Sequence, residues 1–236
     1  MSNQEKMKQN FKSFLFVYMF YTIPFFCIAQ NNGRAYYKKH SDLKIFNKSR
    51  VQDSEKSKAG DEIDSLFILE FNDSLATYYK ARTFKNTNDI LGSGYRGPYF
   101  FDLSDKSILR VQGKYLIKKK ASDYNWYLLD ETSTINGLTC YKATTSIIYE
   151  GRRRQIKRII TAWYTLDVCV PVGPDGFGGL PGLIIRLEND KITTTLQTLK
   201  FTDEDYTITV PMNKRVMNEV KFKHMTDSII NTIDYK

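Results

Sequence analysis

Histidine is nearly absent from this chain, and cysteine is scarce. The 236 residues include two histidines, His40 and His224, and three cysteines, with no H-x-H or C-x-x-C pair. The usual zinc site of histidine and cysteine ligands therefore has too few donors close together. A serine or cysteine nucleophile needs a base within hydrogen-bonding reach, usually a histidine. We expect no metal site and no assembled catalytic nucleophile.

Long helical periodicity is missing before residue 205, which argues against a doubly wound nucleotide-binding fold. Residues 92–97 read GSGYRG and match the G-x-G-x-x-G pattern. That pattern binds a pyrophosphate only between a strand and a helix, and here Pro98 follows at once. No pair of carboxylates stands out as an acid and a base. We expect no cofactor, and an enzyme is the least favoured of three functional hypotheses.

The chain carries a net charge of +9, yet its basic residues are scattered among tyrosines and acidic residues. The two local runs, residues 118–120 and 152–154, are more typical of solvated turns than of sites for acidic lipid or polysaccharide. The composition is otherwise that of a globular protein, and 16 Tyr with 15 Phe favour β structure. We expect no nucleic-acid partner.

The N-terminus has the pattern of a secretory signal peptide. Lys6, Lys8 and Lys12 precede an apolar run over residues 14–28, which is shorter than the roughly 20 residues of a membrane span. Cleavage after Ala29 would remove residues 1–29; lipidation of Cys27 and a retained anchor are the alternatives. We expect export, and a mature chain that lies near the membrane without spanning it.

The remainder predicts an all-β or β-rich α+β fold. Residues 30–62 are polar and read as a flexible entry segment with at most one short strand, and residues 63–236 as a single domain. Short strands separated by turn signals predict a curved antiparallel sheet or open half-barrel. Asn136-Gly137 suits a tight hairpin. From Pro211 onward, apolar residues at helical spacing predict a C-terminal helix.

Cys140 and Cys169 could pair only if the chain bends between them. A hairpin turn centred near Arg152-Arg153 places Cys140 opposite Thr165, and Cys169 lies about 13 Å farther along at ~3.3 Å per residue. A disulfide needs Cα atoms within about 7 Å. The residues therefore form a disulfide if the chain curls back, and otherwise remain two buried thiols.

The stretch 173–184, GPDGFGGLPGLI, contains five of the 13 glycines and, with Pro171, half of the six prolines. Proline restricts the backbone, glycine permits close approach, and the apolar residues need burial. We expect a structured loop packed against the sheet rather than a flexible linker. The residues expected to contact a ligand or partner combine this loop with the two tryptophans: Phe177, Leu180, Pro181, Leu183, Trp126 and Trp163. Aromatic side chains on one face of the sheet would fill a core or line an apolar pocket.

The hexapeptide Gly179–Ile184 resembles the signature of the GLPGLI family. The similarity covers roughly residues 63–200 and includes LEFNDSL (69–75), ETSTINGLTCYKA (131–143) and AWYT (162–165). Leu138-Thr139 departs from the aromatic residue that the family tends to place before the cysteine. The resemblance implies an exported envelope protein of a Gram-negative bacterium, in a family without an established biochemical function.

The strand pattern also resembles the periplasmic lipoprotein carriers, which are half-barrels closed by helices. The first hypothesis is therefore a non-catalytic module that binds or carries a lipid, acyl chain or hydrophobic peptide. The alternative is an assembly subunit of an envelope complex, docking onto another envelope protein through the Gly/Pro loop.

Overall fold

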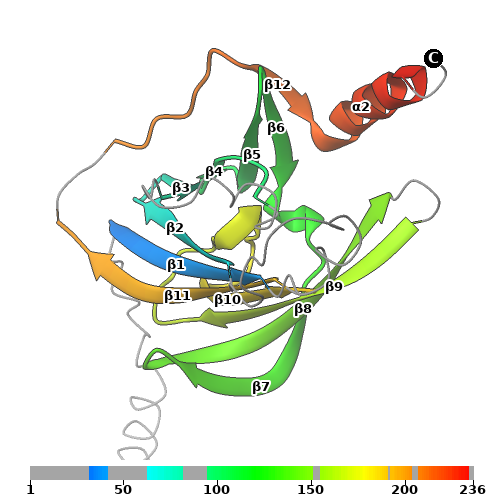
Figure 1. Ribbon diagram of the computed structural model, residues 1–236. Helices are drawn as coiled ribbons and strands as arrows, with labels where there is room; N and C mark the ends of the chain where they lie inside the picture. The colour runs from blue at the N-terminus through cyan, green and yellow to red at the C-terminus, as the bar shows by residue number, and fades with distance from the viewer. Residues whose placement is uncertain are drawn as a thin grey trace, which may run out of the picture.

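The computed structural model describes residues 32–41, 63–81, 95–150, 155–190, 192–203 and 207–233 (Figure 1). The elements, labelled as in Figure 1, follow one another in this order: β1 (Gly33–Ser41), β2 (Ile63–Phe71), β3 (Leu75–Lys80), β4 (Tyr99–Asp102), β5 (Ser107–Gln112), β6 (Tyr115–Lys120), the 3₁₀ turn η3 (Ala121–Asp123), β7 (Tyr127–Ile135), β8 (Leu138–Glu150), β9 (Gln155–Thr165), the 3₁₀ turn η4 (Pro174–Gly176), β10 (Leu183–Asn189), β11 (Ile192–Phe201), β12 (Arg215–Asn218) and the helix α2 (Glu219–Ile233). The expected signal peptide lies outside the described residues.

All twelve strands belong to one open sheet, in the order β12-β6-β5-β4-β3-β2-β1-β11-β10-β9-β8-β7. Neighbouring strands are antiparallel except β12, which runs parallel to β6. Figure 1 shows the sheet strongly curved, with η4 lying inside the curve. The sheet does not close, and one α-helix, α2, is found in the described part of the chain. The predicted fold class is confirmed.

Residues 33–41, within the polar segment for which the sequence allowed one short strand, form the nine-residue strand β1 in the middle of the sheet. β1 pairs with β2 on one side and β11 on the other. Its alternate side chains Ala35, Tyr37 and Lys39 are fully buried. The buried lysine conceals the alternation that marks a half-buried strand. Residues 42–62 lie outside the described part of the chain.

The hairpin signals are confirmed. Asn136 and Gly137 have φ values of 51° and 80°, which suits the type I′ turn that joins β7 to β8. The register of β8 on β9 runs from Tyr141 opposite Tyr164 to Glu150 opposite Gln155, so the turn is centred where the sequence predicted it.

The C-terminal helix begins later than expected. The residues after Pro211 do not form its first turn, because residues 215–218 pair with β6 as strand β12. Val216 and Val220 mimic helical spacing, but both are exposed. The Asn218 side chain accepts a hydrogen bond from the backbone N–H of Lys221 at 2.8 Å, which caps the helix at this point. Phe222 then packs against Ile117 and Met217 at one end of the sheet.

Replacing Gly182 by alanine tests how tightly the Gly/Pro loop joins the sheet. A Cβ at this position would lie 1.8 Å from the carbonyl oxygen of Thr165, so the backbone must shift. We expect Gly182→Ala to lower the free energy of unfolding by at least about 1–3 kcal/mol, the range for an overpacked interior. Ser133→Ala, at an exposed position on β7, should leave it unchanged. Equal thermal midpoints for the two variants would contradict the close approach.

Candidate functional site

The segment between β9 and β10 folds back into the hollow of the curved sheet. Phe177 is 4% exposed and Leu180 2% exposed, and both pack with buried residues of β8, β9 and β10. The ring of Phe177 stacks on Tyr124, with 4.8 Å between their centres. The predicted structured loop is confirmed, and it supplies much of the contact with the concave face.

Three aromatic side chains donate hydrogen bonds to backbone carbonyls of this loop and of β10. The hydroxyl of Tyr124 donates to the carbonyl of Gly176 at 2.8 Å, and the indole N–H of Trp126 donates to that of Gly178 at 2.9 Å. Tyr37 in turn donates its hydroxyl proton to Ile184 at 2.7 Å. A buried carbonyl without a partner destabilises a fold, so these bonds allow an irregular loop to lie in the interior.

Gly176 shows why a glycine is required at the base of the loop. Its φ is +77°, in the left-handed region, and a Cβ would lie 2.4 Å from the ring of Tyr99. Any side chain here would displace the loop from β4.

Lys39 of β1 forms a buried ion pair with the loop. Its side chain is 1% exposed, and its ammonium lies 2.6 Å from the carboxylate of Asp175, which is 21% exposed. The ammonium also lies 4.5 Å from the centre of the Phe67 ring. A lysine in the core requires a compensating anion, which the loop provides.

Tyr78 lies beside this ion pair. Its ring stacks on Phe67 at 5.2 Å, and its buried hydroxyl has no hydrogen-bond partner among the described residues. Burial raises the pKa of Tyr78 well above its usual value, and the nearby carboxylate of Asp175 raises it further. The hydroxyl therefore stays neutral at ordinary pH.

Two further cations lie on the concave face, on strands β5 and β6 near the β12 edge of the sheet. Arg110 of β5 is 9% exposed and donates to the side-chain oxygen of Gln112. Lys119 of β6 is half-buried, donates to the hydroxyl of Tyr124, and lies 4.1 Å from the centre of that ring. Burial lowers the pKa of Lys119 to about 8.

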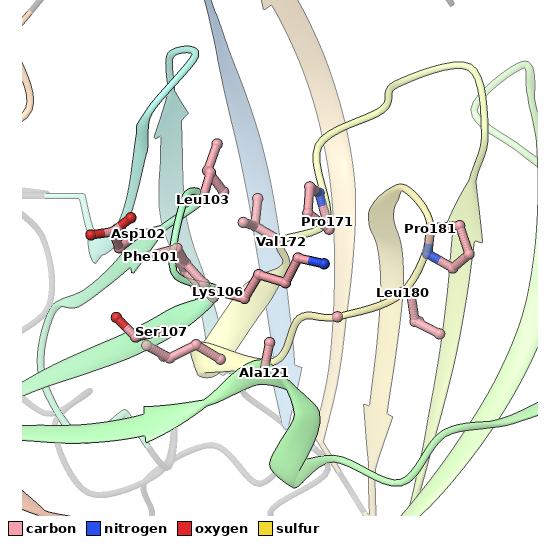
Figure 2. Close-up of a pocket in the computed structure, with 12 residues that line it drawn as sticks. Phe101, Asp102, Leu103, Lys106, Ser107, Ala121, Pro171, Val172, Leu180 and Pro181 are labelled. Atoms are coloured by element: carbon pink, nitrogen blue, oxygen red, sulfur yellow. The ribbon is translucent and has the colours of Figure 1, made fainter.

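A small cavity opens where the loop meets the turn between β4 and β5. Its volume is about 270 Å³. Figure 2 shows Lys106 reaching in among the lining residues, with its nitrogen toward Pro171. The apolar part of the lining comes from both sides of the cavity: Phe101, Leu103, Ile108, Ala121, Val172, Leu180 and Pro181.

The β4–β5 turn that carries Lys106 is held by its own acidic side chains. Asp102 accepts hydrogen bonds from the Ser104 hydroxyl at 2.6 Å and the Ser104 N–H at 3.0 Å, and Asp105 forms an ion pair with Lys118 at 2.8 Å. These hydrogen bonds lower the pKa of Asp102 and of Asp105. The carboxylates thus hold the turn in shape, while Lys106 has no ion-pair partner within the described part of the chain.

The structure brings together most of the predicted contact residues, but not all. Phe177, Leu180 and Trp126 share one cluster, and Pro181 is exposed at the mouth of the cavity. Leu183 is fully buried in the neighbouring cluster. Trp163 alternates with the inward-facing Ala162 and pairs with Lys142, so it lies on the opposite face of the sheet.

Sequence reasoning missed the charged residues of the concave face. Lys39, Arg110 and Lys119 occupy positions where a half-buried strand carries apolar side chains. The only signal for Lys39 is its position, which continues the alternation of Ala35 and Tyr37, although its charge conceals that pattern. Asp175, which pairs with Lys39, lies inside the Gly/Pro segment, and no sequence pattern indicated a role for it.

Cys140 and Cys169 do not form a disulfide with each other, and the alternative of two buried thiols holds only for Cys140, because Cys169 is exposed. Cys140 is a free, buried thiol, and burial raises its pKa. The predicted register of β8 on β9 is confirmed. Tyr141 lies opposite Tyr164, and Cys140 therefore comes level with Thr165. Cys169 lies four residues beyond the end of β9, outside the strand that pairs with β8.

Within the described ranges, no three His, Cys, Asp or Glu side chains gather as a metal site would require. No helix in those ranges is both long and apolar enough to cross a bilayer.

Comparison with known proteins supports the fold and one short motif. A family described as "Protein of unknown function (Porph_ging)" matches residues 150–186, which include the hexapeptide 179–184. No curated protein matches the sequence. Two solved structures of PNGF-II, in the C2 and P21 space groups, superpose with TM-scores of 0.52 and 0.50 at 13% and 12% identity.

These superpositions cover 83% of this chain but 32% and 33% of PNGF-II. This chain thus spans about a third of the length of that protein. At such identity the likeness concerns the fold alone.

Substitution of Asp175 tests the buried ion pair. Asp175→Asn keeps a residue that tolerates the observed φ of 55° but removes the negative charge that lies 2.6 Å from the buried Lys39 ammonium. We expect the free energy of unfolding to fall by about 3 kcal/mol, as for other buried pairs that lose one partner. In Glu131→Gln, which breaks the exposed pair with Lys142, the loss should stay below about 1 kcal/mol. Chemical denaturation of both variants measures the difference, and similar losses would show that the buried pair contributes no more than a surface one.

Proposed function

We propose that this chain is an exported envelope protein of the GLPGLI type, and that it is a non-catalytic binding module for the hydrophobic end of a ligand. The N-terminal basic and apolar segments support export. The Gly179–Ile184 hexapeptide, which lies within the family match, supports the assignment to this type. The periplasm or envelope of a Gram-negative bacterium is the location that this assignment implies.

The observation that carries the binding role is the cavity beside the hexapeptide. Leu180 and Pro181 line one side of an apolar space, Phe101 and Leu103 line the other, and the Lys106 side chain extends between them (Figure 2). An apolar pocket with few polar groups is the ordinary form of a small-molecule site. Its 270 Å³ is below the ~300–1,000 Å³ typical of pockets for drug-sized ligands. The cavity therefore suits one end of a ligand rather than a whole lipid.

A carrier that encloses an entire acyl chain on the concave face is less well supported. The loop already occupies the hollow, with Phe177 and Leu180 buried against the sheet. Release of these contacts would expose two large apolar side chains and leave Lys39 without Asp175. Ligand uptake at the edge of the loop requires none of these changes.

An assembly role is supported by a different surface from the one expected. Docking through Phe177 and Leu180 would require residues that are buried. The strands β7 to β9 instead expose large apolar side chains, and β7 is an edge strand. The exposed residues that would contact an envelope protein are Tyr127, Leu128, Ile148 and Ile159.

Titration with straight-chain alcohols tests the cavity. Each CH₂ that enters it should contribute about 0.8 kcal/mol, or roughly a fourfold gain in affinity. From butanol to decanol we expect affinity to rise and then level off once the cavity is filled. Calorimetry or the shift of amide resonances measures the binding of each alcohol to the protein purified without detergent.

A matched pair of variants locates the binding. Ala121→Leu places extra volume in the cavity, so the plateau should move to shorter alcohols. Ser122→Leu adds the same side chain at an exposed neighbouring position and should leave the series unchanged. No binding of any alcohol, or an unaltered plateau in Ala121→Leu, would exclude this cavity as the site.

A further inference from the structure

Arg110 and Lys119 are diagonal neighbours on the concave face. Arg110 lies opposite Ile117 and Lys119 lies opposite Ile108, so the two cations belong to adjacent strands on the same face of the sheet. Side chains at such diagonal positions are within reach of one another. The Arg110 guanidinium lies 6.0 Å from the ring of Phe222 in α2, and the Lys119 ammonium lies 5.9 Å from the ring of Phe177 in the loop. The pair therefore occupies the interval between the helix and the loop.

Neither cation has a carboxylate partner in ion-pair contact among the described residues. Arg110 donates to the amide oxygen of Gln112, and Lys119 donates to the Tyr124 hydroxyl, both of which are neutral. Lys39, on the same face, shows the opposite arrangement, with Asp175 at 2.6 Å. Burial of a cation without an anion lowers the free energy of unfolding. A fold that buries two such cations together therefore needs another favourable interaction to offset this loss.

The groups around Lys119 shift its pKa in both directions. Burial lowers the pKa of Lys119, and the positive charges of Arg110 and Arg96 lower it further, while Glu219 and Asp123 raise it. The result, a pKa of about 8, leaves the ammonium protonated at pH 7 and neutral at pH 9. Burial likewise lowers the pKa of Arg110, with Arg96 lowering it and Tyr99 and Glu219 raising it.

We propose that Arg110 and Lys119 bind an oxyanion, the phosphate or carboxylate group of a ligand, in the interval between α2 and the Gly/Pro loop. The guanidinium supplies paired donors that match an oxyanion, and the ammonium supplies a compact point charge beside it. The rings of Phe177, Phe222 and Tyr124 exclude water and strengthen both contacts. This site is separate from the cavity at Lys106 and does not rest on the function proposed for it.

Two probes distinguish the sources of the oxyanion. Sulfate represents a phosphate-like ion without a tail, and octanoate represents a carboxylate with an apolar chain; neither changes charge between pH 7 and pH 9. Tighter binding of sulfate indicates a phosphate-type ligand, and tighter binding of octanoate indicates an acyl carboxylate. Amide resonance shifts at constant ionic strength, in the full chain, give both affinities.

The variants test the two cations directly. Lys119→Gln and Arg110→Gln should each weaken the tighter probe about tenfold, the effect of losing one charge-assisted contact. Lys118→Gln is the control, because this neighbouring side chain pairs with Asp105 on the exposed turn. It should bind as the unaltered protein does. Equal affinity in Lys119→Gln and Lys118→Gln would overturn the proposal.

The pH profile gives a second readout that does not depend on the neutral variants folding. Binding to the unaltered protein should fall about fivefold between pH 7 and pH 9, because Lys119 loses its proton through a pKa of about 8 and the neutral form should bind about tenfold more weakly. Lys119→Arg keeps the charge and should remove this fall, because arginine stays protonated over the whole range. A fall of the same size in Lys119→Arg, or no binding of either probe to the unaltered protein at pH 7, would refute the site.

Discussion

The structure depends on how the concave face of one open sheet is covered. A curved sheet has an apolar inner face that must be shielded from water, and here the chain's own Gly/Pro loop lies against it. An irregular loop carries backbone carbonyls that need partners, and Tyr124, Trp126 and Tyr37 provide them at 2.7–2.9 Å for this loop and the start of β10. The aromatic residues thus have two roles, since their rings fill the hollow and their polar ends hold the loop in place.

This manner of covering determines where a ligand could bind. The loop closes the centre of the hollow and is attached there by the ion pair between Lys39 and Asp175. The two edges of the loop differ: an apolar cavity lies at one, near Lys106, and Arg110 and Lys119 lie at the other, toward α2. One suits a hydrophobic group and the other an oxyanion. The proposed binding role concerns these edges rather than the filled interior.

The pattern of alternation predicted most strands, because a side chain's place in a half-buried strand follows from its own neighbours in sequence. It failed for β1, where Lys39 lies in the core, and for β12, where Val216 suggested a helix turn. In both cases the deciding partner is distant in sequence: Asp175 compensates the lysine, and β6 pairs with residues 215–218. Local patterns carry no information about such partners.

By itself the sequence determined that the chain is β-rich, that tight hairpins join its strands, and that the Gly/Pro stretch is a structured apolar loop. These properties depend on backbone preferences and on the period of apolar residues, which act over a few positions. Only the tertiary structure decided which face the loop covers, that Cys140 stays a free thiol, and that Lys39, Arg110 and Lys119 lie on the concave side. Those outcomes depend on contacts between residues far apart in the sequence, such as Tyr37 and Ile184, which are 147 positions apart; the strand order and curvature of the sheet bring them together.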